Sequence, residues 1–190
     1  MKDLATSRQT RLQLAAVWAC AALLTGASIS SARAETSQVS ASGFVSTHRE
    51  EVKASTDAVW RAIVQLPRWW NSQHTWSGNA SNLSLDAQAG GCWCERWGDG
   101  ASAQHGQVLM VQPGRVITIQ ARLGPLLDKP VQAVLTLVTA QQDGKTMLRL
   151  SYQVAGSADA GLDKLAATVD QVLGVQYQRL KRLAETGQAE

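Results

Sequence analysis

The clearest hydrophobic pattern lies near the C-terminus. Between residues 162 and 183 apolar side chains recur every three or four positions, which places them on one face of an α-helix. The positions on this face are Leu162, Leu165, Ala166, Val169, Val172, Leu173, Gln176, Leu180 and Leu183. The pattern predicts one long amphipathic helix, which Gly174 weakens because glycine is a poor helix former.

From residue 82 to residue 154 the pattern changes to the short alternating or apolar runs of β-strands. Six strands are predicted, at residues 82–87, 92–97, 103–111, 115–123, 131–140 and 146–154. Glycine, proline and aspartate separate them, as in Gly98-Asp99-Gly100 and Asp143-Gly144. Such short connections predict an antiparallel meander.

The region before the meander predicts a strand and two short helices. Residues 44–54 form the strand, and Ser55 or Thr56 then caps a helix with apolar residues at helical spacing. Pro67 ends this helix and opens a second helical turn. The order of elements predicts an α+β helix-grip fold, in which a curved antiparallel sheet of about seven strands packs against the long helix.

Residues 1–34 have the form of an export signal. A basic start precedes an apolar stretch, and Ala32-Arg33-Ala34 provides the small residues of a cleavage site. The apolar stretch is shorter than the about 20 residues of a membrane span. We expect cleavage after Ala34, a flexible leader over 35–42 and one domain over 43–187, in an exported protein that is periplasmic in a bacterial cell.

The net charge of +3 belongs to this signal. Cleavage removes four basic residues and one acidic residue, which leaves 14 basic and 14 acidic residues. The remaining chain has no basic stripe, so we expect no nucleic-acid partner. We also expect no stable membrane insertion once the signal is removed.

Two cysteines stand two residues apart in "GGCWCERW", residues 90–97. In a straight strand the Cα atoms of Cys92 and Cys94 are about 6.6–6.8 Å apart, which is too far for a disulfide unless a bulge intervenes. A metal site needs further ligands, because a closed zinc site has four. The favoured interpretation is two small buried apolar residues, and the disulfide and the metal site are the alternatives.

The hairpin after residue 97 decides where His105 lies. A two-residue loop at Asp99-Gly100 puts Cys94 opposite His105. A loop one residue longer puts His105 opposite Trp93, on the face that also carries Glu95 and Trp97. We prefer Trp93 and Trp97 facing inward because they are the largest apolar groups of the strand, and a buried Glu95 then needs a partner such as His105.

A second aromatic cluster lies in "RWWNSQHTW", residues 68–76. Trp69, Trp70, His74 and Trp76 fall between the short helices and the meander, where a helix-grip cavity has its entrance. They are candidates for an aromatic wall of that cavity, and ordinary core packing is the alternative for Trp69 and Trp70.

The order of elements and the segments "ASTDAVWRAIVQLPRWWN", "GGCWCERW", "HGQVLMVQPGRVITI" and "RLGPLL" resemble the START-like superfamily, also called SRPBCC or birch-pollen-allergen-like. Within it the chain is similar to bacterial proteins of the polyketide cyclase or heat-shock ATPase-activator type, over about residues 44–186. The resemblance implies a cavity beneath the long helix for lipids, sterols, polyketides or other apolar molecules. ATP is not expected, because the chain has no phosphate-binding GxxxxGK loop.

The sequence therefore predicts an exported binding protein for a small apolar or amphipathic molecule, without cofactor or metal. The expected ligand-binding residues are Trp69, Trp70, His74, Trp93, Glu95, Trp97, His105, Leu150 and Tyr152. The alternative is a cofactor-independent enzyme of cyclase or lyase type, in which Glu95 acts with His105 or His74.

Overall fold

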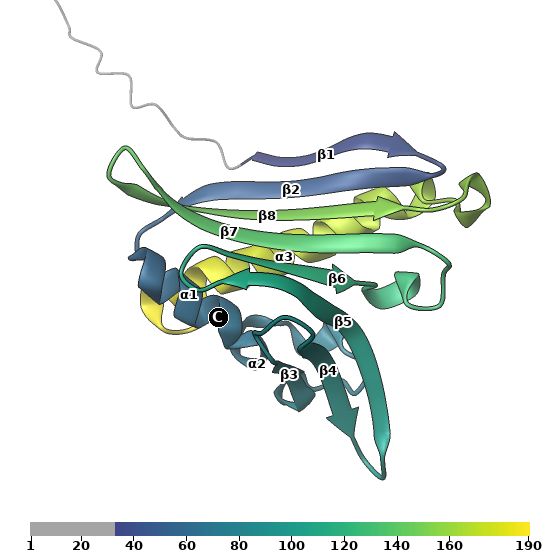
Figure 1. The fold of residues 1–190 in the computed structure, drawn as a ribbon, viewed down its shortest axis with the longest axis horizontal. Coiled ribbons are helices and arrows are strands. Elements are labelled where there is room, and N and C mark those ends of the chain that lie inside the picture. The colour runs from purple at the N-terminus through teal and green to yellow at the C-terminus, as the bar shows by residue number, and fades with distance from the viewer. Residues whose placement is uncertain (1–32) are drawn as a thin grey trace, which may run out of the picture. The chain divides into compact units, whose positions relative to one another are not determined.

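The computed structural model describes residues 33–190, so the expected export signal lies almost entirely outside the described residues. One eight-stranded antiparallel sheet packs against a long C-terminal helix, with the shorter helices beside it (Figure 1). The strands are β1 (Arg33–Ser40), β2 (Gly43–Val52), β3 (Leu83–Leu85), β4 (Cys92–Trp97), β5 (Ala101–Gln112), β6 (Val116–Ala121), β7 (Gln132–Gln142) and β8 (Lys145–Ala155). The α-helices are α1 (Thr56–Val64), α2 (Leu66–Trp69) and α3 (Asp163–Thr186).

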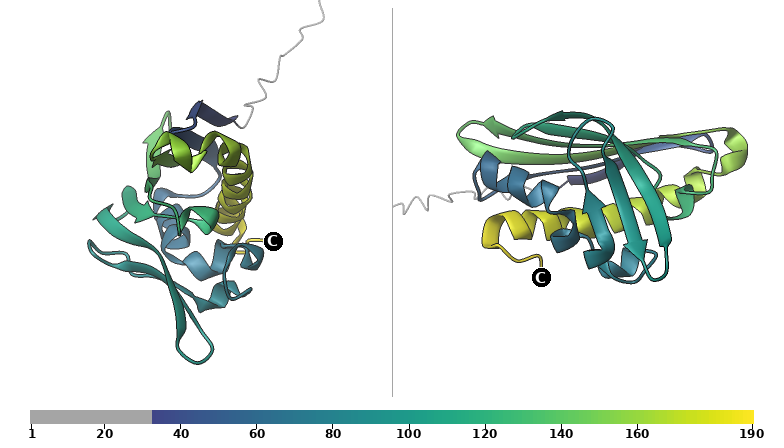
Figure 2. Two further views of the ribbon diagram at one scale, coloured as in Figure 1. Left: turned by 90° about the vertical axis from the view of Figure 1, so that its right-hand side faces the viewer. Right: turned by 60° about the horizontal axis from the view of Figure 1, so that its bottom comes forward.

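The sheet has the order β1-β2-β8-β7-β6-β5-β4-β3, so β2 pairs with β8, the last strand of the meander, and β1 lies at the edge beyond β2. The sheet curves around α3, and α1 and α2 lie on the same side as that helix (Figure 2). Four short 3₁₀ helices complete the domain: η1 (Ser72–His74), η2 (Ala80–Asn82), η3 (Gly124–Leu126) and η4 (Ala158–Ala160). This arrangement confirms the helix-grip fold predicted from the order of elements.

Strand β1 is the main difference from the sheet of about seven strands that the sequence predicts. Residues 33–40 pair antiparallel with β2, for example Glu35 with Thr47, whereas residues 35–42 were expected to be a flexible leader. The side chains of β1 are mostly polar and lack hydrophobic alternation, which is the signal that marks the other strands. Backbone hydrogen bonds to the open edge of β2 form this strand, and such bonds require no particular side chains.

The core lies between the concave face of the sheet and α3. Leu148, Leu150, Tyr152 and Val154 of β8 are all buried, as their alternation predicts. On α3 the buried residues include Leu173 and Tyr177, and the Tyr177 hydroxyl donates to the carbonyl of Leu148 at 2.7 Å. Burial raises the pKa of the Tyr177 phenol well above its ordinary value, so this hydroxyl remains a donor.

Gly174, expected to be a weak point of the helix, allows close packing between α3 and β2. A Cβ atom added at this position would lie 3.2 Å from Cε1 of His48. The His48 ring also stacks on Tyr177, with ring centroids 5.6 Å apart. The missing side chain therefore makes room for a histidine of the sheet.

Among residues 33–190, no helix is both long and apolar enough to cross a membrane.

Helix α1 begins with the serine cap that the sequence predicts. The hydroxyl of Ser55 accepts a hydrogen bond from the backbone N–H of Ala58 at 3.2 Å. Ser157, at the corresponding position before the short helix η4, makes no such bond. We expect Ser55→Ala to lower the free energy of unfolding by about 1 kcal/mol, because a helix N–H loses its acceptor. Urea denaturation should show no comparable loss for Ser157→Ala, and equal effects of the two substitutions would contradict this role of the cap.

Candidate functional site

A cavity of about 460 Å³ lies between α3 and the loops at one end of the sheet. Its walls are mainly apolar and come from four parts of the chain: the loop of residues 70–76, strand β5, the loop of residues 123–125, and one face of α3. The lining residues are Trp70, Gln73, His74, Thr75, Trp76, His105, Leu123, Gly124, Pro125, Leu165, Thr168, Val169, Val172 and Leu173. This volume lies within the range of small-molecule sites.

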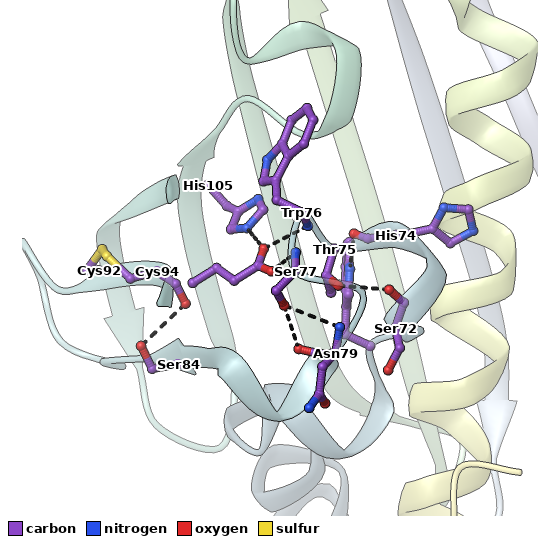
Figure 3. Close-up of polar contacts among 12 residues, drawn as sticks. Ser72, His74, Thr75, Trp76, Ser77, Asn79, Ser84, Cys92, Cys94 and His105 are labelled. Carbon is purple, nitrogen blue, oxygen red and sulfur yellow. Dashed lines mark hydrogen bonds and ion pairs between the residues drawn. A yellow bond between two sulfur atoms is a disulfide. The ribbon is translucent and has the colours of Figure 1, made fainter. Parts of the chain in front are cut away.

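Three of the nine expected ligand-binding residues line this cavity: Trp70, His74 and His105. His74 is exposed at the mouth, and its side chain points toward α3 and away from His105 (Figure 3). Trp76, from the same segment, also lines the cavity and is 53% exposed.

The remaining expected residues support the cavity wall or the core without lining the cavity. Trp69, Leu150 and Tyr152 are buried in the hydrophobic core. Trp93 is also buried, packed between Trp70 (centroids 4.8 Å apart) and His105 (5.9 Å). Trp97 was expected to face inward, but it is only half-buried, because it stands at the hairpin end of β4.

Tyr152 acts on the cavity through a loop. Its hydroxyl donates to the carbonyl of Ala121 at 2.7 Å and accepts from the backbone N–H of Leu123 at 3.3 Å. These bonds fix the start of the loop formed by residues 123–125, which lines the cavity. Burial raises the pKa of the Tyr152 phenol, so the hydroxyl keeps the proton that it donates.

Glu95 is completely buried and accepts hydrogen bonds from three donors, which belong to His105, Trp76 and Ser77, all labelled in Figure 3. Its Oε2 accepts from Nε2 of His105 at 2.8 Å and from the backbone N–H of Trp76 at 3.1 Å. Its Oε1 accepts from the backbone N–H of Ser77 at 2.6 Å. Burial acts to raise the pKa of this carboxyl, but the hydrogen bonds from Ser77, Trp76 and His105 outweigh burial and hold the pKa below its usual value. Glu95 is therefore a carboxylate at neutral pH.

His105 occupies a β-bulge. On one side of the bulge the strands pair as one of the two predicted hairpin loops requires, and on the other side they pair as the other loop requires. Trp93 pairs with Gly106, as the shorter hairpin loop predicts, and Cys94 pairs with Gln104, as the longer loop predicts. His105 is the extra residue between these two pairs. A bulge leaves one residue unpaired and redirects its side chain. Here the redirected imidazole lies between Glu95 and the cavity.

The two cysteines form a disulfide, so the favoured interpretation of Cys92 and Cys94 as free apolar residues is wrong. Their Cα atoms are 5.4 Å apart, closer than in a straight strand. Strand β4 is contracted at the point where the facing strand, β5, carries its extra residue. The straight-strand geometry assumed from the sequence does not apply at this bulge. A metal site that uses these two thiolates is excluded as long as the disulfide is intact.

The loop that carries His74 and Trp76 is held at both ends. At its start, the backbone N–H of Asn71 donates to Oε1 of the buried Gln176 on α3 at 2.8 Å. At its end, Glu95 accepts hydrogen bonds from the backbone N–H groups of residues 76 and 77.

Within residues 33–190, no three potential metal ligands gather in one place.

Several lining residues were not among the site residues expected from the sequence. The loop of residues 123–125 and Thr168 carry no chemical motif, although Gly124-Pro125 is recognisable as a turn. Gln73 and Thr75 stand beside residues that were singled out for their aromatic or imidazole groups. Their roles follow from where the loop lies relative to α3, and no local signal in the sequence indicates that position.

No protein-family model matches the chain, and no curated protein sequence matches it. Several solved structures are similar to this chain in fold. Protein MLL2253 from Mesorhizobium loti is 16% identical with a TM-score of 0.52, over 73% of this chain and 95% of that protein. A protein from Arthrobacter aurescens is 14% identical with a TM-score of 0.54, over 77% and 89%.

DynU16, from the dynemicin biosynthetic locus, is 18% identical with a TM-score of 0.53. The similarity covers 76% of this chain and 48% of DynU16, so the chain spans about half the length of that protein. Identities this low show a shared fold.

Replacing Glu95 tests its part in the site. We expect Glu95→Gln to lower the free energy of unfolding by about 1–3 kcal/mol at neutral pH, because a neutral amide replaces the charged acceptor and its NH₂ group faces a backbone N–H. The lowered pKa means that the carboxylate stabilises the fold above its unfolded pKa of about 4.3, and that this contribution disappears as the pH falls through the folded value. Denaturation of both proteins across this pH range should therefore show the difference shrinking in acid.

A matched control is Glu51→Gln, which removes a partly exposed carboxylate that contacts Lys145 at 2.7 Å. This substitution should change stability by less than about 1 kcal/mol. An equal loss for the two variants at neutral pH would contradict the special position of Glu95.

The disulfide closes a very short loop, which limits its effect on stability. Loop-closure entropy predicts a contribution of only about 1.5 kcal/mol for three residues. We expect the double substitution of Cys92 and Cys94 by alanine to lower the free energy of unfolding by this amount, measured by denaturation without reductant. Alkylation of the native protein should label neither cysteine until a reductant is added. Labelling of both without reductant would contradict the disulfide.

Proposed function

We propose that this chain is an exported binding protein of the START-like (SRPBCC) superfamily, which holds an apolar or amphipathic small molecule between the sheet and α3. The observation that carries the proposal is the apolar cavity of about 460 Å³ beside the long helix. A preformed apolar cavity with few polar groups is the usual form of a small-molecule site. One polar group of the lining is the imidazole of His105, which is fixed by a hydrogen bond from its Nε2 to the Glu95 carboxylate.

The signal-like residues 1–34 support export, and a disulfide is typical of proteins that mature outside the cytoplasm. The similarity to DynU16 supports small-molecule binding by analogy with its biosynthetic locus. Fold similarity alone does not determine function, so the cavity carries the argument.

A second candidate function is a cofactor-independent cyclase or lyase-type activity. The observation that favours it is the 2.8 Å contact between Glu95 and His105, since a paired carboxylate and imidazole can transfer protons. Glu95 itself does not line the cavity and is saturated with donors, so it positions His105. With the natural ligand in hand, Glu95→Gln distinguishes the two functions: an enzyme loses turnover and keeps its ligand, whereas a binding protein loses at most some affinity.

The test of cavity binding starts with mass spectrometry of the protein recovered from its export compartment, first native and then denatured. A small molecule released on denaturation identifies the ligand, and the intact mass shows whether the chain begins at Glu35. Val172→Trp should weaken this binding and that of the apolar dye anilinonaphthalene sulfonate at least about tenfold, because the indole occupies part of the cavity beside α3.

The matched control is Val175→Trp, on the same helix. Val175 is 40% exposed and does not line the cavity, so this variant should bind like the original protein. Equal behaviour of the two variants, with or without bound ligand, would refute binding in the cavity.

A further inference from the structure

We propose that the cavity selects ligands that donate a hydrogen bond, namely phenols or alcohols, because His105 presents an unprotonated Nδ1 to them. This inference rests on the proposed function and defines the ligand class of the same cavity. It begins with the proton shared between His105 and Glu95, whose atoms are 2.8 Å apart.

The shared proton belongs to the imidazole. An ionised carboxylate can only accept hydrogen bonds, and Glu95 already accepts from the backbone N–H groups of Trp76 and Ser77. Nε2 of His105 must therefore be the donor to Glu95. A neutral imidazole carries one N–H, so its other nitrogen, Nδ1, has a free lone pair.

Nδ1 of His105 makes no hydrogen bond within residues 33–190, where the one hydrogen bond of this side chain is made by Nε2. The fully enclosed side-chain atoms without a partner in this part of the chain are Trp93 Nε1, Thr139 Oγ1 and Gln176 Nε2, and Nδ1 is not among them. Because His105 lines the cavity, we infer that the accessible surface of Nδ1 faces a molecule bound there.

His105 is also one of the buried residues of the cavity lining, where a hydrogen bond matters most. It is 6% exposed, whereas the lining residues Gln73, His74 and Thr168 are exposed to solvent. The hydroxyl of Thr75 already donates to the carbonyl of Ser72. A ligand group that reaches His105 therefore meets a hydrogen-bond acceptor among mainly apolar walls. An apolar or acceptor group placed there leaves Nδ1 without a partner, which costs free energy.

The same geometry disfavours acidic ligands. A carboxylate at Nδ1 faces a lone pair, and the Glu95 charge lies directly behind the ring. The bulge and the contact with Trp93 fix the ring in this position, so rotation to another partner is restricted.

The experiment compares phenylphenol, its methyl ether and biphenyl by calorimetric titration at a pH of about 8, which keeps an ordinary imidazole neutral. The three probes share their apolar rings and differ only in the group offered to Nδ1. We expect phenylphenol to bind about tenfold more tightly than either of the others, as one buried hydrogen bond predicts. His105→Phe should reduce this difference to less than about twofold.

Glu95→Gln provides the second variant, which keeps the imidazole. Trp76 and Ser77 donate to different oxygens of Glu95, so the glutamine NH₂ group faces one of these N–H groups in either orientation. The amide therefore no longer holds the His105 proton on Nε2 as the carboxylate does. We expect the preference for phenylphenol over its methyl ether to be smaller in this variant than in the original protein. Nitrogen NMR of the His105 ring should show the proton on Nε2 in the original protein. A purely structural role of Glu95 predicts no change in the preference.

The outcomes separate the two proposals. Equal binding of all three probes by the original protein, or an NMR signal that places the proton on Nδ1, would overturn the proposed selectivity and leave cavity binding standing. If none of the probes binds and Val172→Trp also has no effect on the dye, cavity binding fails, and the selectivity fails with it.

Discussion

The buried carboxylate of Glu95 is the interaction on which the candidate site depends. A carboxylate without partners is very costly in a protein interior, so it requires donors on each side. The donors come from strand β5 and from the loop after η1, which are far apart in the sequence. One side chain of β4 thereby holds the imidazole of His105 and the backbone beside Trp76 in fixed positions. The lowered pKa of Glu95 reflects how well these donors offset its burial.

A second buried polar group joins β2 to α3 and differs in kind from this site. The Ser46 hydroxyl donates to Oδ1 of Asp170 at 2.6 Å, and Nε2 of His48 lies 3.1 Å from the same oxygen. These residue types also form catalytic triads, but in a triad serine and aspartate bind opposite nitrogens of the imidazole. Here both meet Nε2, and no cavity-lining residue is among the three. Their role is to fix the helix on the sheet, together with the space that Gly174 leaves.

The elements with strong hydrophobic periodicity could be predicted from the sequence, and the site could be predicted only in part. The alternation in β8 and the helical spacing in α3 placed Leu150, Tyr152 and Leu173 on inward faces, where the structure has them. Leu150 and Tyr152 were also expected to bind the ligand, but they lie in the core and do not line the cavity. Strand β1 was missed because polar residues paired through the backbone leave no periodic pattern. The disulfide between Cys92 and Cys94 was disfavoured because its feasibility depends on a bulge, and a bulge depends on the register of two strands.

The sequence by itself determined the order of the elements and the helix-grip fold, because local periodicity and turn chemistry encode them. The inward position of the β4 residues Trp93 and Glu95 was only preferred, from the size of the tryptophans, because the sequence left the hairpin register open. Only the tertiary structure decided which of these groups line the cavity. In the structure His105 lines the cavity and bonds to Glu95, His74 points toward α3, and Trp69 is buried in the core. The physical reason is that these outcomes depend on a one-residue shift of register at the bulge and on how the loop of residues 70–76 packs against α3. Both result from contacts between residues distant in the sequence, and a local pattern does not record them.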